Sequence, residues 1–276
     1  MSTTAPAPES KEESQDNSPQ ESQESNDKIV VRDYFNSTGF DRWRRIYGAG
    51  DDINKVQLDI RNGHQRTIDL VLDWFEADKK AAQEAVEGTD EGVSKKIGDR
   101  SVCDAGCGVG ALAIPLAQQG VTVYASDISE KMVGEAIARS GALALDKPPT
   151  FETRDLEAIE GNYDSVICLD VLIHYPDEEM EAMLTHLASC AQSQLILSFA
   201  PKTCFYATLK RIGEFFPGPS KATRAYLHRE KEVVAILNNL GWDVARSELT
   251  ATRFYFSRLM EFVKAEAKNE EKAEAA

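Results

Sequence analysis

The run from Val102 to Gly110, VCDAGCGVG, constrains the fold of this 276-residue chain more than any other stretch. An apolar segment ends in an acid and leads into Gly106, Gly108 and Gly110, after which residues 111–117 keep helical apolar spacing. The pattern predicts a strand, a tight loop and the start of a helix. Glycine is needed because the backbone must turn sharply and lie flat against a ligand, which a Cβ would prevent. We therefore expect a nucleotide-like ligand on this loop.

The glycine spacing alone does not name the ligand, because Gly106-x-Gly108-x-x-Ala111 also satisfies the loose dinucleotide fingerprint. Two acids sharpen the prediction: Asp104 lies two residues before the first glycine, and Asp127 ends the next apolar run. A carboxylate at the end of a second strand accepts the hydroxyls of an adenosine ribose, whichever cofactor carries it. An acid at position 104 would repel a pyrophosphate but attract a methionyl ammonium or a sulfonium. Charge therefore favours S-adenosylmethionine over NAD.

Strand and helix patterns alternate through the middle of the chain, which predicts a parallel sheet with right-handed crossovers. The five expected strands are residues 102–104, 121–127, 150–153, 163–170 and 195–199. Residues 242–244 and 252–259 are expected to add an antiparallel closing hairpin. Ligands bind at the carboxyl ends of such strands. The residues that fall there are Asp104, Asp127, Asp155, Asp170 and His174.

Helical spacing is expected outside the strands as well. Residues 54–75 form one long predicted helix, bent near Gly63, in which we assign His64 to the surface. Residues 76–96 are charged and alanine-rich and are interpreted as a variable insertion. Further helices are expected over residues 129–140, capped by Ser129, and over 177–190, 202–211 and 229–240.

Composition narrows the class of function. The net charge of −15 and the isoelectric point near 4.8 argue against non-specific nucleic-acid binding, which needs a basic surface. A chain of this length with 42% apolar residues is expected to form one domain. No apolar run approaches the roughly 20 residues of a membrane span, so at most peripheral membrane contact is expected. The five cysteines are odd in number and lack a CxxC pair, which indicates reduced thiols rather than a zinc site.

Both ends of the chain are expected to be disordered tails. Residues 1–28 are acidic and rich in Ser, Gln and Pro, and they lack an apolar signal core. They also lack the arginines and the scarcity of acids that are typical of a transit peptide, which indicates a bacterial-type or already processed protein. Residues 263–276 consist mainly of Ala, Glu and Lys and are expected to fray.

Aromatic residues alternate with arginines over residues 29–48. One interpretation is an amphipathic helix whose Trp and Phe pack on the sheet while the arginines remain in water. The other interpretation is a cap over the ligand, with Tyr47 and the neighbouring arginines reaching into the pocket. Residues 202–229 hold a second group of aromatic and basic side chains, which fits either a lid over an anionic substrate or core aromatics with a wet basic rim.

Four blocks carry a resemblance to a known family. They are residues 33–48, Asp104–Gly108, Cys168–Pro176 and Phe215–Lys221. Through them, residues 30–262 resemble the class I S-adenosylmethionine-dependent methyltransferases and, more narrowly, the magnesium-protoporphyrin IX methyltransferase family. The glycine loop is common among methyltransferases, whereas the other three blocks are not. The resemblance implies a Rossmann-like α/β fold: a seven-stranded, mostly parallel sheet with helices on both faces and an N-terminal helical cap over residues 29–75.

The family implies methyl transfer from S-adenosylmethionine to one propionate of magnesium-protoporphyrin IX, with magnesium only in the substrate and no metal held by the protein. A propionate is already ionised at neutral pH, since its pKa lies near that of Glu at about 4.3. The carboxylate therefore needs placing more than deprotonating. We expect His174 and Tyr47 nearest the reacting methyl, with His174 orienting one oxygen. A core histidine satisfied by the backbone is the alternative.

The expected site has two sets of residues. Those expected to bind the cofactor, with Asp127 at the ribose and Asp155 and Leu156 at the adenine, are Tyr47, Asp104, Gly106, Gly108, Gly110, Asp127, Ile128, Asp155, Leu156, Leu169 and His174. Those expected to bind the porphyrin are Arg45, Phe215, Lys221 and Arg224. Because a large flat substrate cannot enter a permanently closed pocket, the cap and the lid insertion at residues 202–229 are expected to be mobile.

Three rival functions stay open on the residues alone: a methyltransferase for another small molecule such as a quinone precursor, a non-enzymatic porphyrin carrier, and an NAD-dependent oxidoreductase. The resemblance suggests the porphyrin-binding subunit of magnesium chelatase as a partner. It also implies a cytoplasmic location with peripheral thylakoid association, or a chloroplast location if a transit peptide has been removed.

Overall fold

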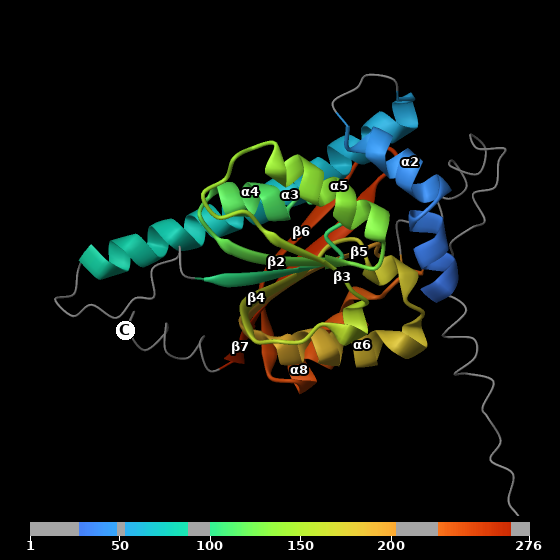
Figure 1. Ribbon diagram of the computed structural model, residues 1–276. Helices are drawn as coiled ribbons and strands as arrows, with labels where there is room; N and C mark the ends of the chain where they lie inside the picture. The colour runs from blue at the N-terminus through green and yellow to red at the C-terminus, as the bar shows by residue number, and fades with distance from the viewer. Residues whose placement is uncertain (1–27, 49–52, 88–99, 203–225, 266–276) are drawn as a thin grey trace, which may run out of the picture.

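The structure is a computed structural model that describes residues 28–48, 53–87, 100–202 and 226–265. Its centre is a seven-stranded sheet in the order β3-β2-β1-β4-β5-β7-β6 (Figure 1). The strands are β1 (Ser101–Ala105), β2 (Thr122–Asp127), β3 (Thr150–Thr153), β4 (Tyr163–Cys168), β5 (Ala191–Phe199), β6 (Trp242–Ala251) and β7 (Phe256–Lys264). β1 to β5 are parallel, whereas β7 is antiparallel to both β5 and β6. The predicted fold class, including the closing hairpin, is confirmed.

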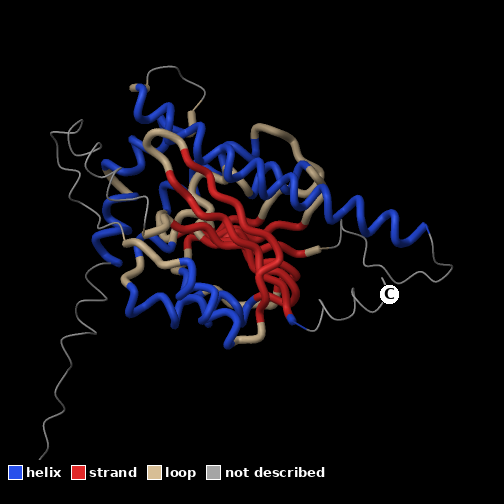
Figure 2. Tube along the Cα trace, turned by 180° about the vertical axis from the view of Figure 1, so that it is seen from behind, coloured by secondary structure: helices blue, strands red, loops and turns tan. Residues whose placement is uncertain are grey.

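Helices cover both faces of the sheet. One face carries α3 (Lys55–Glu87), α4 (Ala113–Gln118) and α5 (Glu130–Gly141), and the other carries α6 (Asp177–Cys190) and α8 (Glu230–Asn239) (Figure 1). Seen from behind, the strands form one twisted layer between the two helical layers (Figure 2). Two short 3₁₀ turns, η2 (Leu156–Ala158) and η3 (Leu172–His174), follow β3 and β4 at the edge where ligands bind in such folds.

Each face of the sheet has its own apolar core, which follows from the alternation of side chains along a strand. In β4 and just beyond, Val166 and Cys168 join the cluster under α6 and α8, while Ile167 and Leu169 join the cluster under α3 and α4. All four are at most 8% exposed. Because burying an aliphatic side chain stabilises a fold by about 1.5–3 kcal/mol, burial on both faces of β4 stabilises the sheet beneath the ligand-binding edge.

The helix α3 differs from its prediction in three ways. It continues to Glu87 rather than ending at Phe75, because Ala, Glu and Lys favour helix and because Asp78 pairs with Arg246 of β6 at 2.8 Å. Gly63 is not a bend signal: a Cβ there would overlap the ring of Tyr255, so the glycine makes room for that ring. His64 is not a surface residue, since only 13% of its side chain is exposed.

The C-terminal hairpin is longer than predicted. Val263 and Lys264, assigned to the disordered tail, belong to β7 and pair with Asp243 and Trp242 of β6. The tail sequence is polar, but the pairing with β6 satisfies its backbone. Residues 1–27 and 266–276, the rest of the two predicted tails, lie outside the described residues.

The N-terminal block forms two helices rather than one. Residues 28–35 and α2 (Thr38–Ile46) are separated by a turn at Asn36 and Ser37. The Oγ of Ser129, the N-cap of α5, lies 2.8 Å from Asn36 Oδ1 and 3.1 Å from Phe35 O, and it accepts the backbone N–H of Met132. One serine therefore both caps α5, as predicted, and docks the N-terminal helices.

The chain leaves and re-enters the domain at one place around residues 203–225, which lie outside the described residues together with most of the predicted lid. Pro201 and His228 form a parallel bridge, Lys202 N donates to His228 O at 3.2 Å, and His228 N donates to Ala200 O at 3.3 Å. The ring of His228 is fully buried, with Nε2 at 2.8 Å from Leu172 O and Nδ1 at 3.1 Å from Asp177 Oδ1. His228 thus ties this point to η3 and to the start of α6.

Candidate active site

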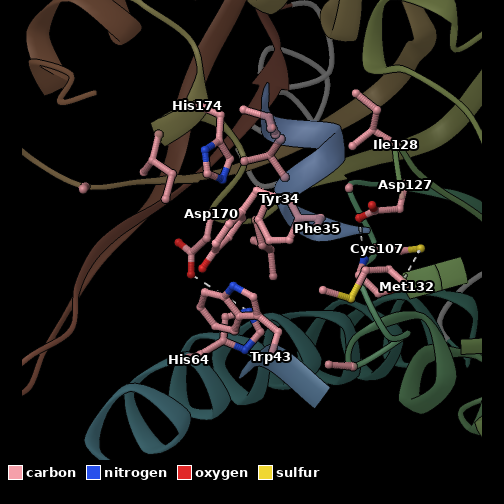
Figure 3. Close-up of a pocket in the computed structure, with 18 of the residues that line it drawn as sticks. Tyr34, Phe35, Trp43, His64, Cys107, Asp127, Ile128, Met132, Asp170 and His174 are labelled. Carbon is pink, nitrogen blue, oxygen red and sulfur yellow. Dashed lines mark hydrogen bonds and ion pairs between the residues drawn. The ribbon is translucent and has the colours of Figure 1, made fainter. Parts of the chain in front are cut away.

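A cavity of about 400 Å³ lies at the carboxyl ends of the parallel strands, beneath the N-terminal helices (Figure 3). Its walls come from the glycine loop, the residues after β2 and β4, the two N-terminal helices, α3 and the turn between β6 and β7. Its lining is mostly apolar, so charges within it are weakly screened.

The glycine loop forms one wall, and its glycines are required by the backbone. Gly106 has φ +85°, and a Cβ on it would overlap Val171 Cγ2. Gly108 has φ +53°, and a Cβ on it would meet no atom of the described protein within 4 Å. The N–H groups of Gly106 and Cys107 both donate to Ser126 O at 2.8 Å, which ties the loop to β2. The loop therefore presents bare backbone to the cavity.

Asp127 ends β2 on the same wall. Its Oδ2 accepts Gly108 N–H at 2.9 Å and its Oδ1 accepts Ser129 N–H at 2.9 Å. Burial raises the pKa of Asp127, while these two backbone donors lower it. Each carboxylate oxygen keeps a free lone-pair direction, so a vicinal pair of hydroxyls can still be bound.

Asp104 lies behind the loop and does not line the cavity. It is 3% exposed, and no described group donates a hydrogen bond to its Oδ2. Burial and then the charge of Asp127 raise the pKa of Asp104 to about 7, against the donor effect of the Ala113 N–H. Its proposed contact with a cationic ligand therefore has to act through the loop rather than at the cavity wall.

His174 closes η3 on the opposite side of the cavity and lines it. Burial lowers the pKa of His174 to about 4, although the charge of Asp170 acts in the other direction. The imidazole is consequently neutral at pH 7. Its Nδ1 is buried and has no partner among the described groups, and its ring meets Phe35 edge-on at a centroid distance of 5.5 Å. A bound group can satisfy that nitrogen.

Tyr47 follows α2 and lines the cavity from the cap. Its ring stacks on Trp43 at 5.6 Å and meets the His64 ring at 4.9 Å, while its carbonyl accepts a hydrogen bond from Arg139. Burial, and then the charge of Asp170, raise the pKa of Tyr47, so the phenol stays protonated and can donate. The two interpretations of this block both hold in part, because the cap packs on the domain and its aromatic side chains also enter the cavity.

The structure brings most of the expected cofactor residues to one cavity. Those that line it are Tyr47, Gly106, Gly108, Asp127, Ile128, Leu156, Leu169 and His174. Gly110 instead turns the loop at φ +78° against Ile114 and Phe151, and Asp155 is exposed at the start of η2. Arg45 is also exposed, with its Nε donating to Asp41 O. The expected porphyrin residues Phe215, Lys221 and Arg224 lie outside the described residues.

Sequence reasoning missed two of the three side chains beside Tyr47, because it expected Asp170 at this edge of the sheet but did not expect His64 or Tyr255 in the cavity. His64, Asp170 and Tyr255 all line the cavity, and Tyr255 OH donates to Asp170 Oδ2 at 2.6 Å. They come from α3, from the second residue after β4 and from the hairpin turn, so no local spacing connects them. The glycine within α3 was the available signal, because a helix interior rarely uses Gly without a packing reason.

The geometry of the cavity by itself, without reference to related proteins, suits an adenosyl methyl donor. The open space beyond Gly108, the bare loop backbone and the free lone pairs of Asp127 match a ribose and the atoms attached to it. In the part of the chain that the structure describes, no three His, Cys, Asp or Glu residues are arranged to hold a metal ion. Cys103, Cys107, Cys168 and Cys190 are buried free thiols, and no helix among the described residues is long and apolar enough to cross a membrane.

Comparisons with known proteins agree with this geometry. Residues 102–194 match the family model for a methyltransferase domain, and residues 168–264 match the model for the magnesium-protoporphyrin IX methyltransferase C-terminus. The magnesium-protoporphyrin O-methyltransferase of Synechocystis is 57% identical over 86% of this chain and 96% of that protein. The chloroplastic magnesium protoporphyrin IX methyltransferase of Arabidopsis thaliana is 53% identical over 86% of this chain and 71% of that protein.

A solved structure extends the comparison to three dimensions. The crystal structure of the magnesium protoporphyrin IX methyltransferase from Synechocystis PCC 6803 with bound S-adenosylhomocysteine superimposes with a TM-score of 0.71 at 56% identity, covering 86% of this chain and 99% of that one. The fold is that of a class I S-adenosylmethionine-dependent methyltransferase. Within that class, the chain belongs to the magnesium-protoporphyrin IX methyltransferase family, which confirms the resemblance seen in the sequence.

Proposed function

We propose that this protein transfers the methyl group of S-adenosylmethionine to one propionate carboxylate of magnesium-protoporphyrin IX, giving the monomethyl ester in chlorophyll biosynthesis. The observation that carries the proposal is the 57% identity to the Synechocystis enzyme over 96% of that protein's length. The match therefore includes the cap and the C-terminal region, not only the glycine loop that many methyltransferases share. Neutral polar groups at the cavity wall suit the methylation of a carboxylate.

Carboxyl methylation is a problem of placement. The bound donor supplies a methyl group on a positively charged sulfur. The attacking propionate is ionised at pH 7, since its pKa is about 4.3, and so the protein needs no strong base. Placement at about 3–3.5 Å in line with the methyl, with partial loss of water, is what the cavity must provide.

His174 and Tyr47 are proposed as the groups that place the carboxylate. Both line the cavity and both are uncharged at neutral pH, because burial lowers the pKa of His174 and raises that of Tyr47. Each can give a carboxylate oxygen one hydrogen bond without cancelling its charge. That matters because a full salt bridge would stabilise the ionised ground state more than a transition state in which charge disappears.

The donor site is proposed to rest on the loop and the strand ends. Gly106 and Gly108 would lie under the ligand, Asp127 would bind the ribose hydroxyls, and Ile128 and Leu156 would flank the adenine. Leu169, Asp104, Gly110 and Asp155 complete the proposed donor site, the last three as groups that shape it from outside the wall. Arg45, Phe215, Lys221 and Arg224 are proposed for the porphyrin, because cationic and aromatic side chains suit a flat dianion.

The test of the function is incubation of purified protein with methyl-labelled S-adenosylmethionine and a set of acceptors. Magnesium-protoporphyrin IX should be converted to a monomethyl ester, identified by mass spectrometry and by loss of the label on mild alkaline hydrolysis. Protoporphyrin IX without magnesium and a quinone precursor serve as competing acceptors. Label in the quinone precursor alone would replace the proposed acceptor, and donor-independent porphyrin binding with no ester would indicate a carrier.

We also propose that the porphyrin is received from the porphyrin-binding subunit of magnesium chelatase, and that membrane contact is peripheral at thylakoids or within a chloroplast. Ile29 and Val30, at 39% and 46% exposure, give the first helix of the cap an apolar surface that supports an external contact. Pull-down with the chelatase subunit and co-sedimentation with thylakoid-lipid vesicles test the two contacts separately. An Ile29→Ser/Val30→Ser variant that changes neither result would remove this support.

A further inference from the structure

Asp170 occupies an unusual position in the cavity wall. It is the second residue after β4 and has φ +56°, a left-handed backbone that Asp and Asn adopt more readily than other non-glycine residues. Of its side chain, 22% is exposed, and the residue lines the cavity. In the view of Figure 3, Asp170 lies between His174 and His64, with Asp127 on the other side of the cavity. Asp170 is therefore an acidic side chain at the edge of the sheet where ligands bind.

Three hydroxyl groups hold the Asp170 carboxylate in place. Oδ1 accepts Ser198 Oγ at 2.7 Å and Ser257 Oγ at 2.9 Å, and Oδ2 accepts Tyr255 OH at 2.6 Å. The Asp170 backbone N–H donates back to Ser198 Oγ at 2.8 Å. A carboxylate has about four lone-pair directions, so Oδ2 keeps one for a ligand. The donors orient the charge without neutralising it, because hydroxyls are uncharged.

Other elements are built around this carboxylate. Tyr255 OH also lies 3.2 Å from Thr67 Oγ1, and the Tyr255 ring fits against α3 only because residue 63 is Gly. Ser198 belongs to β5 and Ser257 to β7, so two strands, the hairpin turn and α3 all contribute to fixing one side chain. Such rigid support is what preorganises a charged group for binding.

The charge of Asp170 has no cationic partner within the described part of the chain. The one basic side chain there with a nitrogen within 4.0 Å is His64, through Nε2. Burial lowers the pKa of His64, so its ring is neutral at pH 7. An anion in a mostly apolar cavity attracts a cation more strongly than it would in water. It would also repel both propionates of a porphyrin.

Of the two ligands in the proposed function, only the methyl donor carries organic cations, namely its sulfonium and its ammonium group. We propose that Asp170 is the anionic subsite for the cationic methionyl end of the methyl donor. The inference rests on the proposed function only for the identity of the donor. It also gives the neighbouring groups distinct tasks: Asp170 holds the donor, while the neutral His174 and Tyr47 are left for the acceptor.

Isothermal titration calorimetry without porphyrin tests the subsite with three ligands. S-adenosylmethionine has both cations, S-adenosylhomocysteine has the ammonium only, and methylthioadenosine has neither. Asp170→Asn keeps the size of the side chain and suits a left-handed backbone. This variant should weaken the binding of S-adenosylmethionine by about 10- to 100-fold, which is the range for losing a hydrogen bond to a charged group. Its affinity for methylthioadenosine should not change. An equal loss for S-adenosylhomocysteine assigns the contact to the ammonium, and no loss assigns it to the sulfonium.

Two variants control the measurement. Asp164→Asn neutralises a buried carboxylate at the start of β4 that accepts Ser101 N–H and Oγ far from the cavity wall, and it should change no donor affinity. Tyr255→Phe removes one donor to Asp170 and keeps the charge, so it should weaken S-adenosylmethionine several-fold at most. Circular dichroism and the urea midpoint establish that each variant folds.

Two results would overturn the subsite. Equal losses of S-adenosylmethionine and methylthioadenosine would show that Asp170→Asn only distorts the cavity, and unchanged donor affinity would show that the carboxylate does not face the donor. Fluorescence titration with magnesium-protoporphyrin IX distinguishes a third case. If Asp170→Asn weakens porphyrin binding and leaves donor binding unchanged, Asp170 contacts the acceptor rather than the donor. Failure of the proposed function is distinguishable, since the wild-type protein would then bind no donor or methylate no porphyrin.

Discussion

The two walls of the cavity are built on different principles. The loop wall consists of glycine backbone and Asp127, fixed by φ angles and by bonds between neighbours on β1 and β2. The cap wall consists of side chains such as Phe35, Tyr47 and His64, carried by three helices and held by contacts between rings. A backbone wall has one shape and suits a ligand common to many enzymes. A side-chain wall can be altered one residue at a time and suits the ligand that distinguishes a family.

Breaking the loop wall should have the largest effect. Gly106→Ala puts a methyl group into Val171 and forces a left-handed backbone on alanine, so we expect a loss of more than about 10²-fold in S-adenosylhomocysteine affinity. The unfolding free energy should also fall by about 1–3 kcal/mol, the range for such strain. Calorimetry and urea denaturation measure the two losses. Gly141→Ala is the matched control, because a Cβ at this position in α5 meets nothing, and normal donor affinity is expected.

Altering the side chains that face the acceptor should lower turnover and leave the loop wall intact. His174→Ala or Tyr47→Phe should reduce turnover by about 10²-fold if positioning is the main contribution, with little change in S-adenosylhomocysteine affinity. The relative loss should stay nearly constant from pH 7 to 9, because burial keeps His174 neutral and the propionate is ionised throughout. Steady-state kinetics across that range measure it. Full activity in His174→Ala would give the positioning role to Tyr175 or to a backbone amide of the same loop.

Separating the two walls should have an intermediate effect, because Ser129 joins them. Ser129→Ala removes the N-cap of α5 and the contacts to Asn36 and Phe35, and it should lower the unfolding free energy by about 1–2 kcal/mol. Hydrogen exchange should become faster over residues 28–46 and stay unchanged in β4. In the wild-type protein, donor and porphyrin together should slow exchange in the same segment if the cap is mobile. Equal exchange with and without ligands would make the cap a fixed packing element.

The smallest effect concerns pH, where two buried groups oppose one another. The pKa of Asp104 is raised to about 7, so between about pH 4 and 7 the native state holds a proton that the unfolded chain has lost. The contribution of Asp104 to the free energy of unfolding therefore decreases as the pH rises through this range. The pKa of His174 is lowered to about 4, so between about pH 4 and 6.5 the unfolded chain holds the extra proton and stability increases with pH. The two slopes largely cancel in the wild-type protein.

Single variants expose the cancellation. Asp104→Asn should leave a free energy of unfolding that rises towards pH 6.5 more steeply than in the wild type, by up to about 1.4 kcal/mol per pH unit. His174→Asn should shift the slope by a similar amount in the opposite direction. Urea denaturation of the ligand-free proteins at half-unit pH steps measures both slopes. Identical slopes in the two variants would contradict the opposed titrations.

The sequence predicts the loop wall well because its signals are local. The glycines, Asp127 and the cap at Ser129 are each recognised from neighbours a few residues away, and the parallel sheet follows from the alternation of strand and helix patterns. The same reasoning located His174, which lies in the short 3₁₀ turn after the buried strand β4. The boundaries of α6 were also accurate: it spans the predicted Asp177–Cys190 and begins directly after Pro176.

The sequence predicted a cap with Tyr47 near the ligand, but it could not predict that His64 belongs to the cap wall, nor the setting of Asp170. His64 carries a surface-like pattern in α3, and its burial depends on Tyr47 and Tyr255, which come from distant segments. Hydroxyl groups that hold a carboxylate have no spacing rule when they come from β5, β7 and a hairpin turn. The position of Asp104 behind the wall depends on the direction of one side chain, which the motif does not specify.

The shared exit and entry point at Pro201 and His228 joins the two ends of one segment of the chain. A segment whose ends are already joined can change in length with only a logarithmic effect on the entropy of closing it. The bridge at Pro201 and His228 therefore separates the sheet and the cavity from changes in the length of the sequence between its two ends.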